Sequence, residues 1–243
     1  TVNPYPIADI VPDVNAGCQG LSVNFNNNST LGGTYAWSFA GATPTTSTAY
    51  SPPAITFNTA GNNMVFIVVT VAGCTTNDTT FINIAPLPTP AFTIAPNVGC
   101  SPVISSFTNT SGITAGDTYL WTFDNGTTST LQNPPPQTYT TTGVDSTYTV
   151  ELLIAAANGC SDSVSQTVIV HANPVALFTP NNDTVCANTP ILFSNNSTGA
   201  TSYSWNFGDA STSTLTTPSH TYPTPNNYNV QLIATSAFAC VDT

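Results

Sequence analysis

Short apolar stretches, many of them alternating with polar residues, run through the whole chain of 243 residues. The strongest are β-branched and of strand length, at residues 65–71, 148–154 and 228–234. Polar turn residues interrupt the pattern about every 8 to 12 residues, and no helical period is found. The pattern predicts an all-β protein of immunoglobulin-like β-sandwiches, each with about seven short strands.

One alternating stretch, Tyr-x-Trp-x-Phe, occurs three times, and its tryptophans are evenly spaced along the chain. The copies are Tyr35/Trp37/Phe39, Tyr119/Trp121/Phe123 and Tyr203/Trp205/Phe207. A fixed period of about 84 residues indicates a tandem array of three units. Period-two spacing places the three rings on one face of a strand. We expect that face in the core; the alternative is a platform on which sugar rings stack.

Proline-containing connectors mark the boundaries between these units. We predict three domains at residues 6–86, 87–172 and 173–243, the third lacking its last strand. Residues 1–5 are predicted to end a preceding repeat, because Thr1-Val2 aligns with the last-strand residues Ile169-Val170. We therefore expect further sequence on both sides; the alternative is a strand donated by a neighbouring subunit.

Six cysteines fall two to a repeat, one before the aromatic motif and one after it. They are Cys18 and Cys74, Cys100 and Cys160, Cys186 and Cys240. Repetition predicts one disulfide inside each unit, stapling one end of the sandwich. Each would close a loop of about 55 to 60 residues and contribute about 4 kcal/mol.

Such bridges imply an oxidising, extracytoplasmic compartment. One alternative is that the cysteines are buried free thiols. A metal site is less favoured, because no Cys-x-x-Cys is present and only His171 and His220 could add imidazole ligands. We expect no metal.

The chain has no Lys or Arg and eleven acidic residues, for a formal net charge of −11. Without basic side chains it cannot neutralise phosphate, so we exclude nucleic acid as a partner. Anionic membrane surfaces are disfavoured for the same reason. Every apolar run is shorter than the length of about 18 residues that a helix needs to span a bilayer, and direct membrane insertion is not expected.

The sequence contains few residues that could act in catalysis. Glu151, the single glutamate, lies in a β-branched strand, and no repeat places a base beside a Ser or Cys nucleophile. We expect no catalytic residues, no cofactor and no enzyme activity.

Residues of the third repeat resemble the polycystic kidney disease (PKD) domain. The segments are Tyr203-Ser204-Trp205-Asn206-Phe207-Gly208-Asp209, Pro218-Ser219-His220-Thr221-Tyr222 and Tyr228-Asn229-Val230-Gln231-Leu232. The first two repeats carry weaker versions, and the resemblance implies a seven-strand sandwich. Ser38, Thr122 and Asn206 replace the Asp that follows Trp in the family, so no calcium site is expected. Asp124 and Asp209 are predicted to cap their turns instead.

The Gly-Cys-like step before the last strand and the Asn-rich turn resemble repeats in giant surface adhesins of gliding, type IX-secreting bacteria. The resemblance implies an extracellular location and O-glycosylation at Asp-(Ser/Thr) motifs. The matching acceptors are Thr79, Ser146, Ser163 and Thr184.

We interpret the chain as a non-enzymatic stalk segment of a cell-surface adhesin or filament, serving adhesion or gliding motility. Its expected partners are neighbouring repeats, with surface polysaccharide or another cell surface as further candidates. The alternatives are a spacer or carbohydrate-binding module of a secreted hydrolase, and a filament subunit completed by donor-strand exchange.

Overall fold

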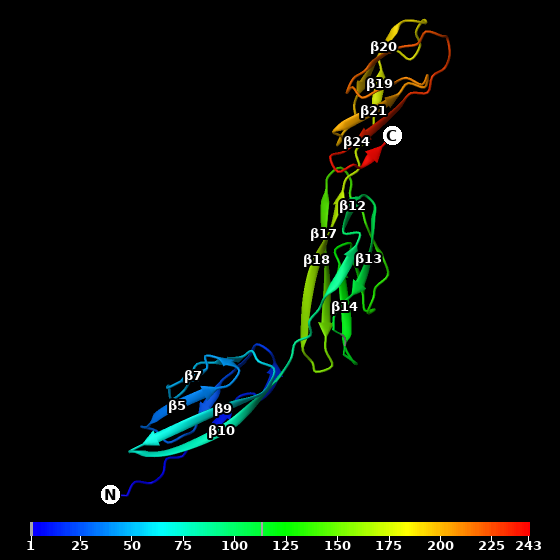
Figure 1. The fold of residues 1–243 in the computed structure, drawn as a ribbon. Helices are drawn as coiled ribbons and strands as arrows, with labels where there is room; N and C mark the ends of the chain where they lie inside the picture. The colour runs from blue at the N-terminus through cyan, green and yellow to red at the C-terminus, as the bar shows by residue number, and fades with distance from the viewer. Residues whose placement is uncertain (1, 113) are drawn as a thin grey trace. The chain divides into compact units, whose positions relative to one another are not determined.

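The computed structural model describes residues 2–112 and 114–243, and these residues form strands and turns without a helix. Figure 1 shows the three successive groups of strands. The fold is a multi-domain chain of immunoglobulin-like β-sandwiches, which confirms the fold class predicted from the alternating pattern. The boundaries proposed for the repeats stay a prediction; we use "first", "second" and "third repeat" for residues 6–86, 87–172 and 173–243.

The first repeat contains ten strands. They are β1 (Ile10–Pro12), β2 (Ala16–Cys18), β3 (Leu21–Val23), β4 (Phe25–Asn27), β5 (Thr34–Phe39), β6 (Ala42–Thr43), β7 (Thr46–Ser47), β8 (Ile55–Phe57), β9 (Gly61–Val71) and β10 (Cys74–Ala85). One sheet has the order β2-β10-β9-β5-β7, and β3-β8-β6 and the pair β1-β4 form the other face. Between them lie Trp37, Ile67 and Ile82 from the first sheet and Phe25 and Phe57 from the second.

The second repeat has the same plan. Its strands are β11 (Phe92–Ala95), β12 (Val98–Cys100), β13 (Val103–Asn109), β14 (Thr118–Phe123), β15 (Thr127–Ser129), β16 (Gln137–Tyr139), β17 (Ser146–Ala155) and β18 (Ser161–His171). The sheets are β12-β18-β17-β14-β15 and β11-β13-β16. Trp121 is fully buried and packs edge-on against Phe92, 5.0 Å between ring centres.

The third repeat has a much shorter last strand. Its strands are β19 (Phe178–Pro180), β20 (Pro190–Asn195), β21 (Ser202–Asn206), β22 (Thr212–Ser213), β23 (Ser219–Thr221), β24 (Gln231–Thr235) and β25 (Val241–Asp242). The sheets are β22-β21-β24-β25 and β19-β20-β23, around a core that includes Phe193, Trp205 and Leu232. β25 pairs with Ala234 and Thr235 of β24.

The chain divides into two compact units that do not coincide with the repeats. Unit 1 is Thr1–Ala91, Ser111–Leu120 and Leu153–Val164, which combines the first repeat with part of the second. Unit 2 is Phe92–Thr110, Trp121–Leu152 and Ser165–Thr243, which combines the rest of the second repeat with the third. The second repeat is therefore shared between the two units.

Candidate functional site

The first cysteine of a repeat lies at the end of the sandwich from which the chain leaves. In the first repeat, β2 pairs in parallel with β10 and places Cys18 opposite Ala85, the final residue of that last strand. In the second repeat, β12 pairs in the same way with β18, and Cys100 lies opposite His171. In both repeats the cysteine is set beside the connector to the next repeat.

The second cysteine lies at the opposite end. Cys74 is the first residue of β10, directly after the two-residue turn Ala72-Gly73, in which both residues have positive φ (48° and 82°). Cys74 and Ala85 are the two ends of this strand, and at 3.2–3.4 Å per residue they lie about 36 Å apart. The Cα atoms of a disulfide lie about 4.4–6.8 Å apart. Cys18 and Cys74 therefore cannot bond to each other.

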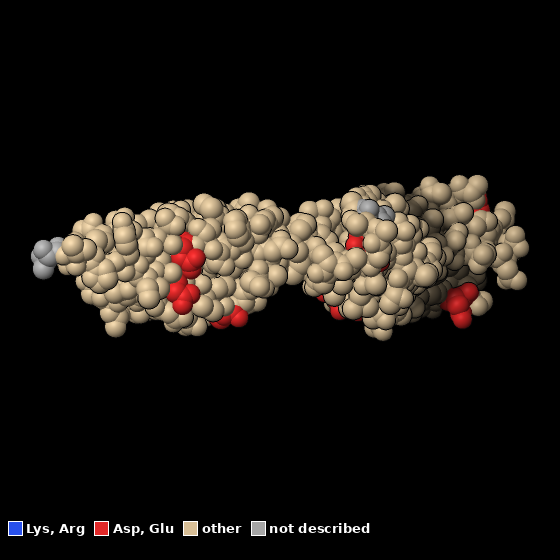
Figure 2. All heavy atoms as spheres, turned by 90° about the horizontal axis from the view of Figure 1, so that it is seen from below, with Lys and Arg blue, Asp and Glu red and all other residues tan. Residues whose placement is uncertain are grey.

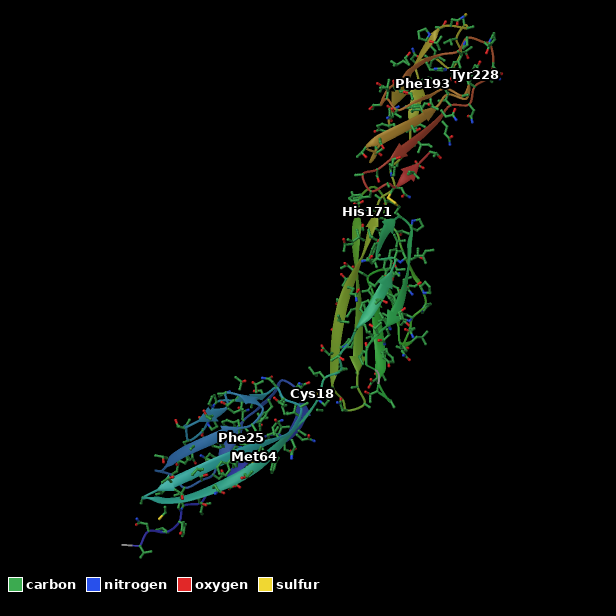
Figure 3. All side chains as sticks on the ribbon, viewed as in Figure 1. Cys18, Phe25, Met64, His171, Phe193 and Tyr228 are labelled. Atoms are coloured by element: carbon green, nitrogen blue, oxygen red, sulfur yellow. A yellow bond between two sulfur atoms is a disulfide. The ribbon has the colours of Figure 1, made fainter. Side chains whose placement is uncertain are left out.

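The predicted bridge inside each repeat is wrong, and the cysteines join successive repeats instead. Cys18 is bonded to Cys160 and Cys100 to Cys240, with Cα separations of 5.7 and 5.5 Å. Each bridge lies within one compact unit. Figure 3 labels Cys18 at the end of the first repeat and shows a sulfur–sulfur bond beside His171. Cys74 and Cys186 are free thiols.

Polar contacts surround the first bridge. Gln19 follows Cys18, and its Oε1 accepts a hydrogen bond from the Leu87 N–H at 3.0 Å. Asn158, two residues before Cys160, donates from Nδ2 to the carbonyl of Pro86 at 3.0 Å. Both hydrogen bonds are made to the connector between the repeats. Hydrogen bonds therefore hold this connector beside the disulfide.

The second bridge has a corresponding set of contacts. The Ser101 N–H donates to the His171 carbonyl at 2.9 Å, and Nδ2 of Asn173 donates to the Ser101 carbonyl at 2.7 Å. The His171 ring stacks on Phe238, in the turn before Cys240, with ring centres 3.6 Å apart and planes 9° apart. Ring stacking thus accompanies the disulfide at this joint.

A hydrogen bond with Asp145 orients the histidine at this second joint. His171 Nδ1 lies 2.7 Å from Asp145 Oδ2, and the Ala172 N–H donates to Asp145 Oδ1 at 2.9 Å. The hydrogen bond with His171, followed by that from Ala172, lowers the pKa of Asp145 from its ordinary value. Sequence reasoning considered His171 only as a possible imidazole ligand and missed this role, because Asp145 lies 26 residues away.

The PKD-like motif of the third repeat forms a separate cluster. Asp209 Oδ1 accepts hydrogen bonds from the hydroxyl and, at 3.0 Å, the N–H of Ser211, which is the turn cap predicted from the sequence. Its Oδ2 lies 2.8 Å from His220 Nε2, and the His220 ring stacks on Phe207. The Ser211 hydroxyl, and then the bond with His220, lower the pKa of Asp209 to about 2.

Asp124, at the corresponding turn of the second repeat, does not cap its own turn. Its Oδ2 accepts a hydrogen bond from the Thr149 N–H on β17 at 3.3 Å. Asn125 takes the capping role, since its Oδ1 accepts from the Thr127 N–H at 3.1 Å. Asn125, the second residue of the turn, therefore caps it, and Asp124 does not.

The repeated aromatic motif lies in the sandwich interior. Seven of its nine rings are buried, and Tyr119 and Tyr203 are half-buried. Each tryptophan also donates from Nε1 to a backbone carbonyl: Trp37 to Ala49 (2.9 Å), Trp121 to Leu131 (3.0 Å) and Trp205 to Leu215 (2.9 Å). No sequence signal pointed to these acceptors, which lie in the Thr/Ser/Pro-rich segment that follows each motif.

The four candidate O-glycosylation residues differ in accessibility. Thr79, Ser163 and Thr184 are exposed, whereas Ser146 is half-buried with its Oγ 2.9 Å from Thr141 Oγ1. Thr79 lies in the middle of β10, paired with Phe66 of β9.

The described residues 2–112 and 114–243 contain no group of three or more His, Cys, Asp or Glu residues that could hold a metal ion. The same residues include no helix long and apolar enough to cross a membrane. On the face drawn in Figure 2, acidic side chains are scattered and no basic ones are seen.

One family comparison covers the third repeat. Residues 171–243 match the PKD domain family. This match covers less than a third of the chain. The first two repeats resemble the third in their sequence motifs and in the order of their strands. No curated protein matches the chain.

Solved structures with similar folds are multi-domain chains. The I-band fragment I67–I69 from titin is 14% identical and covers 99% of this chain and 98% of its own, with a TM-score of 0.36. The FN1–FN3 domains of chicken CNTN1 are 12% identical, cover 96% of this chain and 93% of their own, and have a TM-score of 0.27. Similarity at this level carries no functional conclusion.

Proposed function

We propose that this chain is a non-enzymatic, extracellular repeat segment of a cell-surface adhesin or filament, acting as a stalk that transmits force. The carrying observation is that both disulfides join one repeat to the next. A disulfide inside a domain stabilises that domain against unfolding. A disulfide between two domains instead adds a second covalent link between them, beside the backbone. That property is useful where the chain is pulled from its ends.

The composition supports the extracellular part of the proposal. Structural disulfides persist in oxidising compartments and are rare in the cytosol. Thr, Ser and Asn, with a formal net charge of −11, supply the solubility that Lys and Arg would otherwise share. The motif resemblance to adhesins of gliding, type IX-secreting bacteria favours a role in adhesion or gliding motility, with surface polysaccharide or another cell as the partner.

Surface labelling tests this assignment. An antibody raised against residues 6–243 should label intact cells that make the protein, without permeabilisation, and mild surface proteolysis should remove the signal. Labelling that requires permeabilised cells would contradict an extracellular stalk.

O-glycosylation forms the second part of the proposal. Thr79, Ser163 and Thr184 are the accessible acceptors, and a bulky sugar on each would stay in solvent. The intact mass of the native protein should exceed that of the bare polypeptide. Replacement of these three residues by Ala should remove the excess. A native mass equal to the polypeptide mass would rule glycosylation out.

A second candidate function is a filament subunit completed by a donated strand, and one observation favours it. In the third repeat a groove of about 420 Å³ lies beside Gln231 and Leu232, lined also by Leu177 and Phe178. Polymerisation that persists after all six cysteines are replaced by Ser would support donor-strand assembly; a monomer would contradict it.

A further inference from the structure

The two bridges define two classes of cysteine with different positions in the repeat. Exit cysteines, Cys18 and Cys100, lie opposite the last residue of the last strand. Entry cysteines, Cys160 and Cys240, lie in the turn that precedes the last strand. Both bridges join the exit cysteine of one repeat to the entry cysteine of the next.

Cys186 has the local backbone of an exit cysteine. The residue two positions after Cys18 is Gly20, with φ 87°, and its N–H donates to the Phe57 carbonyl at 2.8 Å. The residue two positions after Cys186 is Asn188, with φ 62°, and its N–H donates to the Tyr222 carbonyl, also at 2.8 Å. Phe57 and Tyr222 occupy the same place in their repeats, each directly after a Thr.

Cys74 has the local backbone of an entry cysteine. A residue with positive φ immediately precedes each member of this class: Gly73 (82°), Gly159 (86°) and Ala239 (62°). Cys74 Sγ also lies 4.0 Å from the Asn3 carbonyl oxygen, in the Pro-containing segment that leads into the first repeat. It therefore faces the connector on its own entry side.

Solvent exposure also separates the free cysteines from the bonded cysteines of the same class. Cys160 and Cys240, which are bonded to a preceding repeat, are each 1% exposed, whereas Cys74 is only partly buried. Cys18 and Cys100, which are bonded to a following repeat, are partly buried, whereas Cys186 is exposed. Each free thiol is more accessible than the bonded members of its class.

We propose that Cys74 and Cys186 are the two open halves of this same joint. Cys74 forms a disulfide with the exit cysteine of a repeat placed before the first. Cys186 forms a disulfide with the entry cysteine of a repeat placed after the third. A second copy of this chain carries both complementary partners, so copies link head to tail through Cys186 of one and Cys74 of the next. The proposal depends on the joint geometry and not on the adhesin role.

The chemistry is a balanced thiol–disulfide exchange. The Cys186 thiolate attacks oxidised glutathione and forms a mixed disulfide, releasing one glutathione thiolate. The Cys74 thiolate of the next copy then attacks the Cys186 sulfur and releases the second glutathione. Two thiols are oxidised, one disulfide of glutathione is reduced, and two protons leave the cysteines.

Two single variants of the full chain test the pairing. Cys74→Ser keeps only the exit thiol and Cys186→Ser only the entry thiol, so neither variant alone can form the proposed bond. After incubation in a glutathione redox buffer, a mixture of the two should give a disulfide-linked dimer at least about ten times more abundant than in either variant alone. Peptic peptides, prepared at acid pH to prevent exchange, should contain Cys186 joined to Cys74.

A matched thiol controls for simple reactivity. Thr128 is exposed on β15, away from either cysteine class, and Thr128→Cys in a Cys74→Ser, Cys186→Ser background supplies a single accessible thiol. Mixed with Cys74→Ser, it should cross-link no better than either single variant alone. Dimers of equal yield in all mixtures, a linkage other than Cys186 to Cys74, or no cross-linking at all would overturn the proposal.

Discussion

Cys18 of the first repeat is bonded to Cys160 of the second, 142 residues further along the chain. Together with the bond between Cys100 and Cys240, this makes two covalent nodes. Three chain segments run between the nodes, from 18 to 100, from 100 to 160 and from 160 to 240. Under tension only the shortest of the three, from Cys100 to Cys160, can become taut.

Single-molecule stretching from the two termini should show this connectivity. The taut path runs from the N-terminus to Cys18, from Cys160 back to Cys100, and from Cys240 to the C-terminus. Its extended length is about 290 Å at about 3.6 Å per residue. Under reducing conditions the whole chain is free, and the extended length should rise to about 870 Å.

Single cysteine variants distinguish this pairing from bridges inside each repeat. Cys160→Ser should lengthen the oxidised path by about 22 residues, or about 80 Å, because Cys100–Cys240 then holds residues 100–240 alone. A Cys100–Cys160 bridge would instead release about 60 residues, or about 215 Å, in the same variant. The larger step would contradict the joints described above.

The buried tryptophans should contribute to stability through both packing and their N–H groups. Trp121→Ala should destabilise the second repeat by about 3–5 kcal/mol because it empties the core. Trp121→Phe should cost about 1–3 kcal/mol, since the Leu131 carbonyl loses its donor. Urea unfolding followed by circular dichroism measures both.

Thr122→Ser is the control for this series, because Thr122 is exposed on the same strand and its replacement should change stability by less than about 0.5 kcal/mol. A Trp121→Phe variant as stable as this control would show that the indole N–H makes no contribution.

Acid should weaken the third repeat through Asp209. Its pKa in the folded chain, about 2, is below the ordinary 3.8, so the unfolded chain takes up the proton first as the pH falls. The stabilisation is present above about pH 4 and is lost between about pH 4 and pH 2. Thermal melting across this range should show a smaller decrease in melting temperature for Asp209→Asn than for the wild type.

Asp162→Asn, which removes an exposed carboxylate on β18, controls for net charge. If the melting temperatures of Asp209→Asn and Asp162→Asn both fell with pH as that of the wild type does, the contacts of Asp209 with Ser211 and His220 would not contribute to stability in acid.

Trypsin should not cleave the chain even after reduction and unfolding, because it contains no Lys or Arg. Chymotrypsin is the positive control, since the same unfolded chain offers 9 Tyr, 12 Phe and 3 Trp. Tryptic fragments from within residues 1–243 would disagree with the sequence itself.

The sandwich class followed from local sequence, because alternation decides which side chains of a strand are buried. Trp121 and Phe123 could be placed on one face of a strand from their spacing alone. The cysteine pairing could not, since it depends on which end of the sandwich each residue reaches. The parallel pairing of β2 with the end of β10, strands far apart in the sequence, moves Cys18 away from Cys74.

The turn caps show one case in which local sequence was misread. Asp209 lies two residues after Phe207 of the aromatic motif, and the residue at the same distance from Phe123 is Asn125. Each of the two caps its turn by accepting a hydrogen bond from the backbone N–H two residues further on. Asp124, one position earlier, instead accepts a hydrogen bond from β17. The cap follows from spacing to the motif, whereas the contact of Asp124 with a distant strand could not be predicted from a single stretch of sequence.

The interleaved bridges also change what a protease can achieve. In an ordinary tandem array one backbone cut separates everything on either side of it. Here a single cut at any point between Cys18 and Cys240 leaves two intact segments between the covalent nodes, and the molecule stays in one piece. Between Cys18 and Cys240, a fragment is lost only after two cuts within one segment or after one cut in each of the three segments. The array therefore tolerates a single cut at any of its exposed turns in this region.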